Sequence, residues 1–419
     1  MKYLAVIAFL ALPQMAMAQG LHQEVRSPSL DFMPPHETVD RLMAEDPGVL
    51  RARALVQSAE AEARGRAAGP HEFTLRGEYV SRATSLEGRL NEWSAGVARG
   101  IRLPGKAEAD NKIGASAVSV AENGFGDARH QAATLLKTLY LAWVLAEADA
   151  AMAAEDVQNY ERQAAATERS RQLGQSAALQ VEQVQAALAQ SRAQYAQAVQ
   201  AQLDAKMTLQ RSFPGLTLPM AAVTMPDPEP PPGAWSDWRA AVLDDNHEVK
   251  MARSEADRRE WLAKRASLDR FADPTFELRT FQERSGHETG FGIGFSLPIG
   301  GALRSAAADQ AAADASAAAI AARRVLREVE IAADRDVIAA QQGLAAWRQT
   351  RSAAESSRQM LARMQRAVQL GDQGLTELLL AQRQDFETRR TELRTRAGAH
   401  GAVLQLMIDA HRIWSLGDE

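Results

Sequence analysis

Histidine and carboxylate side chains are the groups in this chain that could bind a metal ion or transfer protons. Two histidines four residues apart on a helix share one face and can hold a metal ion, but no two of the eight histidines have that spacing. They are His22, His36, His71, His130, His247, His287, His400 and His411. The chain also has no cysteine, which removes thiolate ligands, disulfides and cysteine nucleophiles together. We therefore expect no metal site.

Sequence motifs for catalysis are missing as well. There is no nucleophile elbow, no phosphate-binding loop and no pair of carboxylates in a context that fixes their geometry. Asp227 and Glu229 lie in a proline-rich segment, where we expect nothing to hold them in place. The net charge is −5, and basic and acidic residues alternate along helices, as on solvated helix faces. We expect a protein that is not an enzyme, needs no cofactor and binds no nucleic acid.

Three features of the sequence occur twice at nearly the same separation. Val49 is followed by Ala52 and Arg53, and the same pattern starts again at Val249, 200 residues later. The strand-like ending at Leu103-Pro104-Gly105 returns at Leu297-Pro298-Ile299-Gly300, and the helix break at Leu173-Gly174 returns at Leu370-Gly371. A constant separation of different features indicates one duplicated unit.

Each unit is predicted to contain a helix, two strands, a very long helix, a break and a second long helix. We place the first unit at 19–213, a proline-rich linker at 214–235 and the second unit at 236–419. The strands are expected at about 71–83, 92–103, 274–284 and 289–298, and the long helices at 106–172, 177–212, 302–369 and 375–414. The first helix of each unit is expected to be continuous, over about 37–68 and 235–268. Gly124 and Gly126 predict a kink in helix 106–172.

The predicted strands have one apolar and one polar face. In the last strand, for example, Phe291, Ile293 and Phe295 alternate with glycines. Arg99 breaks the pattern, because it falls among the apolar positions of its strand, where a bulge or a site near lipid headgroups would accommodate it. Strands of this length and pattern are typical of the wall of a membrane barrel.

The other elements constrain how such strands could meet a membrane. Residues 1–18 have the pattern of a secretory signal peptide, and no later stretch is apolar enough for a membrane helix. Four strands cannot close a barrel, and lipid does not tolerate an open sheet edge. A dimer would supply about eight strands and a trimer about twelve, which favours the trimer.

The order of these features resembles the outer-membrane efflux protein family typified by TolC. The resemblance lies in the alanine-rich helices broken at Leu173-Gly174 and Leu370-Gly371, in the Pro104-Gly105 and Pro298-Gly300 strand exits and in the internal repeat. Size and the lack of a lipid-anchoring cysteine are similar to members that serve pumps of the cobalt-zinc-cadmium type. The fold class is thus expected to be mostly α with transmembrane β: long coiled-coil helices plus a two-stranded hairpin in each duplicated unit.

The resemblance implies a homotrimer with a twelve-stranded outer-membrane barrel and an α-helical tunnel through the periplasm. It also implies docking to a periplasmic adaptor and an inner-membrane pump of the resistance-nodulation-division class. The function expected is therefore passive export of toxic small molecules or metal ions. The alternative from a different class is a periplasmic coiled-coil adaptor or scaffold that keeps its strands out of lipid.

By the same resemblance, the two helix breaks would lie at the periplasmic mouth of the tunnel. The residues expected there are Arg171, Gly174, Gln175, Gly371, Asp372 and Gln373. Repeated around a threefold axis, Asp372 would form a carboxylate ring that attracts cations. The alternative is that it caps a helix in a turn flanked by glycines, and both roles can hold together. Arg171 is either a salt-bridged charge at a helix end or a latch of the gate.

Overall fold

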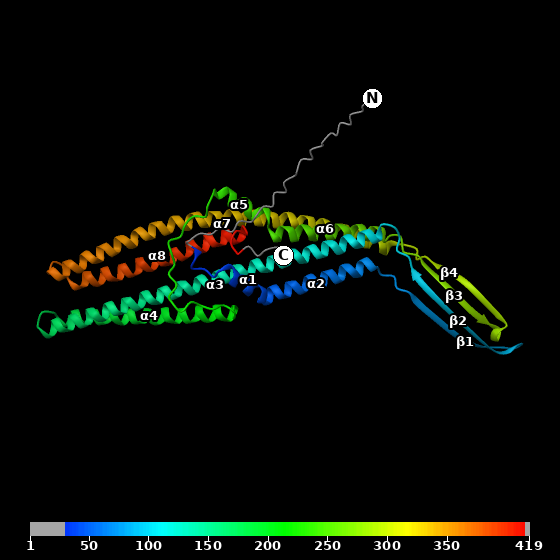
Figure 1. Ribbon diagram of the computed structural model, residues 1–419, viewed down its shortest axis with the longest axis horizontal. Helices are drawn as coiled ribbons and strands as arrows, with labels where there is room; N and C mark the ends of the chain where they lie inside the picture. Colours follow the sequence, from blue (N-terminus) through cyan, green and yellow to red (C-terminus); the bar gives the residue numbers. More distant parts are fainter. Residues whose placement is uncertain (1–29, 415–419) are drawn as a thin grey trace, which may run out of the picture.

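The computed structural model describes residues 30–414, so the predicted signal peptide at 1–18 lies outside the described residues. The chain forms a long body of helices with a four-stranded antiparallel sheet at one end and two helical hairpins at the other (Figure 1). The predicted fold class, mostly helical with a small sheet, is confirmed. Among residues 30–414, no helix is both long and apolar enough to cross a membrane.

The two halves of the chain contain the same α-helices and β-strands in the same order. The first half consists of α1 (His36–Glu45), α2 (Pro47–Ala68), β1 (Thr74–Thr84), β2 (Gly88–Gly100), α3 (Lys106–Gln172) and α4 (Ala178–Ser212). The second consists of α5 (Trp235–Asp244), α6 (His247–Leu268), β3 (Thr275–Glu283), the short η2 (Arg284–Gly286), β4 (Glu288–Ser296), α7 (Ala302–Leu370) and α8 (Leu375–Asp409). The helices have 10, 22, 67 and 35 residues in the first half and 10, 22, 69 and 35 in the second.

The first helix of each half is divided in two, where the sequence analysis expected one continuous helix. Asp46 accepts a hydrogen bond from the backbone N–H of Val49 at 3.0 Å, and Asn246 accepts one from the N–H of Val249 at 3.0 Å. Such a side chain pairs an N–H group that the start of a helix leaves free. Each cap therefore begins a new helix, and the prediction of continuous helices is wrong at both places.

The long helices α3 and α7 each carry two shorter helices along their length. On α3, α2 packs along the part next to the sheet and α4 along the distant part, while α7 carries α6 and α8 in the same way (Figure 1). The helix α6 also packs against α3, which joins the two halves. The helix α3 runs without interruption through Gly124 and Gly126, where the sequence predicts a kink.

Small residues let these helices approach closely. A Cβ atom added to Gly114 of α3 would lie 2.9 Å from the Cα of Ala63 in α2. Because real Cβ atoms do not come that close to backbone, Gly114 is required at this crossing. The helix contact thus depends on glycine and alanine, which fits the low aromatic content of 5%.

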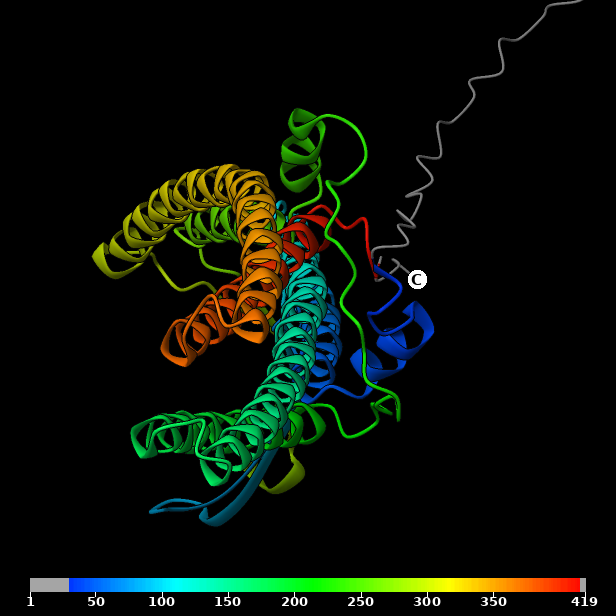
Figure 2. The same ribbon diagram turned by 90° about the vertical axis from the view of Figure 1, so that its left-hand side faces the viewer.

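The main apolar core lies at the waist of the molecule rather than along the hairpins. It joins the middle of α3 and of α7 to α1, α5 and the end of α8; its fully buried members include Leu136, Val144, Leu404 and Leu406. The proline-rich segment between α4 and α5 runs along the outside of the bundle (Figure 2). It is held there by bonds from Arg396 to the carbonyl of Met225 at 3.1 Å and between His400 and the carbonyl of Pro226 at 2.8 Å.

Asp227 in the same segment forms an ion pair with Arg351 of α7. The expectation that nothing fixes this carboxylate is therefore wrong. Its partner lies 124 residues away in the sequence, so no local pattern reveals the contact.

The sheet has the strand order β1-β2-β3-β4, and every neighbouring pair is antiparallel. The central pair, β2 with β3, joins the hairpin of one half to the hairpin of the other. β1 and β4 are the outer strands of this four-stranded sheet.

Candidate functional site

One face of the sheet carries rows of apolar side chains, most of them exposed, that cross all four strands. Leu75 pairs with Val97, Val97 with Leu278 and Leu278 with Ile293, which makes one continuous row. The exposed fractions of Leu75, Leu278 and Ile293 are 84%, 47% and 72%. A neighbouring row contributes Phe276 and Phe295, whose ring centroids lie 5.2 Å apart. Exposed apolar surface of this extent marks a place where another apolar phase or protein covers it.

The opposite face of the sheet is charged and is crossed by ion pairs. Arg76 of β1 reaches across Gly96 of β2 to Glu277 of β3, with a guanidinium-to-carboxylate distance of 3.1 Å. Arg82 and Glu92 form a second pair at 2.6 Å between β1 and β2. The alternation that the sequence predicts thus separates an apolar from a polar face of the sheet.

Side chains of β3 lie over the glycines of β4 on this polar face. A Cβ atom on Gly290 would be 2.2 Å from the ring of Phe281, and one on Gly292 would be 3.4 Å from the side chain of Arg279. The guanidinium carbon of Arg279 also lies 5.5 Å from the centre of the Phe281 ring. The glycines of β4 therefore provide room for large side chains of the next strand.

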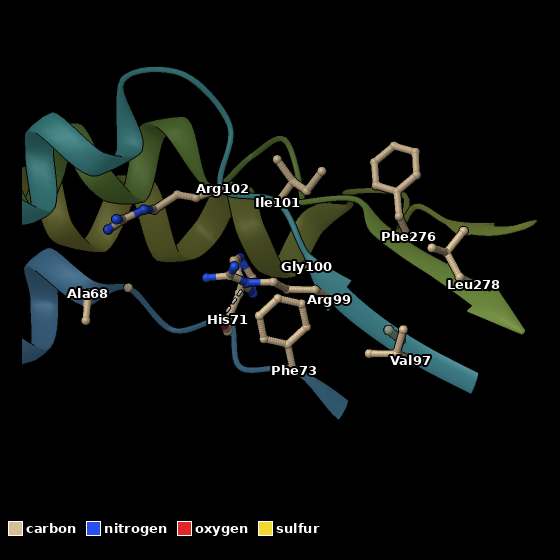
Figure 3. A pocket seen from close by; sticks show the side chains of 12 residues that line it. Ala68, His71, Phe73, Val97, Arg99, Gly100, Ile101, Arg102, Phe276 and Leu278 are labelled. Atoms are coloured by element: carbon tan, nitrogen blue, oxygen red, sulfur yellow. Dashed lines mark hydrogen bonds between the residues drawn. The ribbon is translucent and has the colours of Figure 1, made fainter. Parts of the chain in front are cut away.

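Arg99 faces the apolar side of the sheet without a bulge. Its strand keeps regular register, with Ala98 opposite Glu277 and Arg99 opposite Phe276. The guanidinium carbon lies 4.5 Å from the centre of the Phe73 ring, and Nε donates to the carbonyl of His71 at 3.4 Å (Figure 3). These groups line a cavity of 460 Å³ at the base of the sheet. A cation–π contact with Phe73 and a position near the helices accommodate the charge of Arg99. The strand therefore needs no bulge at this residue.

The strand exits lie where the sheet meets the helices. Gly105 has a positive φ of 83° and starts α3, a conformation that favours glycine. Gly300 leaves no space for a side chain, because its Cβ would lie 2.4 Å from the carbonyl oxygen of Arg270. Pro104 occupies the turn before Gly105, and Pro298 lines a cavity of 680 Å³ beside Phe295 and Arg304.

A buried lysine fastens this junction. Lys106, at the start of α3, is 1% exposed. Its Nζ donates to the carboxylate of Asp273 and to the carbonyl of Phe271, both at 2.7 Å. Burial raises the pKa of Asp273, but hydrogen bonds from Lys106, His71 and the N–H of Leu103 outweigh this and lower that pKa to about 2. Lys106 thus ties the segment that directly precedes β3 to the start of α3.

At the opposite end, both helical hairpins turn through the same glycine motif. Gly174 after α3 and Gly371 after α7 have φ values of 76° and 80°. In the first turn, the N–H of Gln175 bonds to the carbonyl of Ser170 at 2.8 Å; in the second, the N–H of Asp372 bonds to that of Ala367 at 2.9 Å. This is the Schellman ending of a helix, which requires a left-handed residue.

The structure gathers the six predicted mouth residues at these two tips, where their side chains are exposed. Arg171 pairs with Glu168 of its own helix at 3.0 Å and 2.7 Å, so it is a salt-bridged charge at a helix end. Asp372 does not cap α8, because the N-cap residue is Gly374 and no side chain bonds there. The capping interpretation of Asp372 is therefore wrong. The side chain of Gln373 is likewise exposed beside it.

The sequence analysis does not predict the ion pairs that join the two hairpins. Arg390 of α8 makes two bonds of 2.7 Å to the carboxylate of Asp149 in α3, and Arg389 bonds to Glu155 at 3.2 Å. Asp156, on the same part of α3, accepts a bond of 2.7 Å from Ser191 of α4. Burial raises the pKa of Asp156. Arg390 and Asp149 are 241 residues apart, and no spacing rule connects them.

No protein-family sequence model matches the chain, and no curated protein matches it by sequence. Solved structures do match. A membrane protein from Pseudomonas aeruginosa aligns with a TM-score of 0.77 and 16% identity over 95% of this chain and 93% of that one. The outer membrane protein VceC from Vibrio cholerae aligns with a TM-score of 0.77 and 15% identity over 90% of this chain and 96% of that one. The open MtrE outer membrane channel of Neisseria gonorrhoeae aligns with a TM-score of 0.73 and 14% identity over 98% of both chains.

The chain has the fold of outer-membrane channel proteins. The match extends over both hairpins and the sheet, since it covers nearly the whole of each chain. Within this channel fold, no three His, Asp or Glu side chains of residues 30–414 are placed to hold a metal ion.

Proposed function

We propose that this chain is the outer-membrane channel of a tripartite efflux pump, a passive conduit for toxic small molecules or metal ions. The observation that carries the proposal is the apolar row Leu75–Val97–Leu278–Ile293, in which all members but the half-buried Val97 are exposed. At ~25 cal/mol per Å², leaving such side chains in water is unfavourable. Insertion of this face into the outer membrane removes that cost. The charged face, with Arg76 and Glu277, then faces an aqueous lumen.

The sheet edges support a homotrimer. β1 and β4 are the outer strands within the chain, and their backbone groups need partners in lipid. Three copies, joined edge to edge, would give a closed barrel of about twelve strands, wide enough for a water-filled lumen. The same symmetry would place three copies of the α3/α4 and α7/α8 hairpins around one axis as a periplasmic tunnel.

The tips would then form the mouth that meets a periplasmic adaptor and an inner-membrane pump. Gly174 and Gly371 shape the turns, and Arg171, Gln175, Asp372 and Gln373 are exposed around them. The pairs Arg390–Asp149 and Arg389–Glu155 join the hairpins above the mouth. We propose that these pairs hold the mouth narrow and that their separation widens it. The export of cobalt, zinc or cadmium stays a prediction.

A soluble adaptor is the competing function, and the sheet argues against it. An adaptor would leave the Leu75–Ile293 row in water, whereas the fold match to channel proteins includes these strands. The fold match is to channel proteins, and the proposal is a channel without enzymatic activity.

Membrane fractionation tests the proposal. The mature protein should stay with the outer membrane after a high-salt wash and should conduct ions in planar bilayers. A variant lacking residues 71–104 should lose both properties. Recovery of the intact protein as a monomer in plain buffer, without detergent, would overturn the proposal.

A further inference from the structure

Arg99 carries its charge on the apolar face of the sheet, at the end next to the helices (Figure 3). Within residues 30–414, its guanidinium contacts the ring of Phe73, at 4.5 Å from the ring centre, and the carbonyl of His71, at 3.4 Å from Nε. Neither group is a carboxylate, so neither balances the charge. Arg76 on the polar face differs, because it pairs with Glu277. A charge without a counter-ion is costly next to lipid, so insertion of this face calls for an anion at Arg99.

The arginine lies in a cavity of 460 Å³ whose other walls are largely apolar. The apolar residues come from β2, from the segment after it and from β3, and include Val97, Ile101, Phe276 and Leu278. Phe276 and Ile101 are 42% and 51% exposed, so this apolar wall is open to the outside. The volume falls in the range of ~300–1,000 Å³ that is typical of small-molecule sites.

We propose that this cavity binds one anionic phospholipid, whose phosphate meets the guanidinium of Arg99 and whose acyl chain lies along the apolar wall. The inference rests on the proposed insertion of the sheet into the outer membrane. It adds a lipid of defined charge at a defined place on the wall of the channel.

The guanidinium of Arg99 has the donors that a phosphate needs. An arginine side chain carries five N–H groups in a planar fork, and the bond to His71 uses the one on Nε. The N–H groups of the two terminal nitrogens can pair with two phosphate oxygens at once, which a lysine ammonium does not match in geometry. The cation–π contact with Phe73 holds the fork beside apolar surface. A lipid phosphate thus supplies the negative charge that the described neighbours of Arg99 do not.

The surroundings change from apolar to charged along the cavity, as a phospholipid does. On the side toward the strands, Val97 and Leu278 also belong to the apolar row that the proposed function places in lipid. On the side toward the helices, Arg102 lines the cavity and pairs with Asp110 of α3 at 2.9 Å. Arg99 lies between these two parts (Figure 3). An acyl chain and a headgroup would therefore each find a matching surface.

The second half of the chain also has an arginine beside an apolar cavity at this end of the sheet. Arg304 lines the cavity of 680 Å³ together with Phe295 and Ile299, and its Nη1 donates to the carbonyl of Asp269 at 2.8 Å. The ring of Phe295 lies 5.2 Å from that of Phe276, which lines the first cavity, so the two cavities adjoin. Two neighbouring cavities with arginines fit a belt at the level of lipid headgroups.

Lipid retention by the full mature protein tests the site. The protein is inserted into bilayer discs of equal parts phosphatidylglycerol and phosphatidylcholine, extracted with mild detergent and weighed by native mass spectrometry to count bound lipids. Wild type should retain the anionic lipid in preference, and Arg99→Gln should reduce this preference about fivefold. Arg99→Lys keeps the charge but loses the fork, and should fall between the two. The matched control Arg279→Gln removes an arginine that contacts Phe281 on the polar face, and should keep the wild-type preference.

Two further outcomes separate a lipid site from a plain anion site and from a failure to insert. Millimolar glycerol phosphate, a water-soluble headgroup, should not displace the retained lipid, because it lacks the acyl chains; displacement would overturn the lipid assignment. The inference is also overturned if wild type conducts ions but retains both lipids equally, or if Arg99→Gln and Arg279→Gln behave alike, and the channel function then stands. A wild-type protein that does not enter the discs would overturn the proposed function and this inference together.

Discussion

Arg390 and Asp149 form a two-bonded ion pair that joins α8 to α3, with both distances at 2.7 Å. Both side chains are mostly buried, with exposed fractions of 22% and 15%. Paired, charge-assisted hydrogen bonds of this kind fix geometry as well as adding stability.

Replacing this arginine should loosen the two hairpins. We expect Arg390→Ala to lower the free energy of unfolding by about 1–3 kcal/mol, because a partly buried carboxylate loses its partner. If the pair also holds the mouth narrow, single-channel conductance in planar bilayers should rise. The control is Arg192→Ala, which breaks an exposed pair with Glu161 inside one hairpin and should leave conductance unchanged. If the two variants had equal conductance, the Arg390–Asp149 pair would have no role in holding the mouth narrow.

Asp372 should affect ion selectivity but not stability. Its side chain caps no helix, so Asp372→Ala should change the free energy of unfolding by less than about 0.5 kcal/mol. A carboxylate ring at the mouth attracts cations, and its removal should raise conductance and reduce cation preference. Reversal potentials in a salt gradient measure this directly. Unchanged selectivity would contradict a ring of Asp372 side chains.

A charge placed in the apolar row should prevent membrane insertion. Ile293→Arg puts a guanidinium on the exposed apolar face, at a cost of about 2–4 kcal/mol near the middle of a bilayer. We expect less heat-modifiable protein in the outer-membrane fraction. Ser94→Arg, on the polar face and opposite Glu78, should insert normally. If both variants inserted equally well, the assignment of the two faces would be wrong.

The junction carboxylate should give acid-dependent stability. Asp273→Asn leaves the ammonium of Lys106 without its closest carboxylate, and we expect a loss of about 3 kcal/mol at pH 7. The pKa of Asp273 is lowered to about 2, so its contribution is present above pH 4 and disappears as pH falls through 2. Thermal midpoints of wild type and variant should thus converge between pH 4 and pH 2. Asp309→Asn, in an exposed pair with Arg270, should show no such convergence.

The crossing of α2 and α3 should not tolerate even one methyl group. Gly114→Ala brings a Cβ to 2.9 Å from the Cα of Ala63, so we expect a destabilisation of about 1–3 kcal/mol. Gly65→Ala in α2 meets no atom within 4 Å and should instead stabilise the helix by up to about 1 kcal/mol. Denaturant midpoints of the two variants should therefore move in opposite directions.

The architecture was readable from the sequence because its signals are periodic. Alternation in Phe291, Ile293 and Phe295 predicts one exposed apolar face, and Gly174 and Gly371 predict the helix ends. The sequence analysis predicts continuous helices across Asp46 and Asn246, although a capping residue stands at each. The contacts that act between elements carry no such signal. Folding alone brings Arg390 to Asp149, and His411 to His130 and His247.

The matched helices of the two halves have a consequence for the dimensions of the molecule. Because α4 and α8 both have 35 residues, the hairpins α3–α4 and α7–α8 extend equally far beyond the waist. Removing whole heptads from one hairpin alone would leave its tip short of the other tip. Equal deletions in α3, α4, α7 and α8 would give a shorter protein whose two tips still lie level. The length of the molecule can thus change without any change to the sheet or to the helix breaks at its two ends.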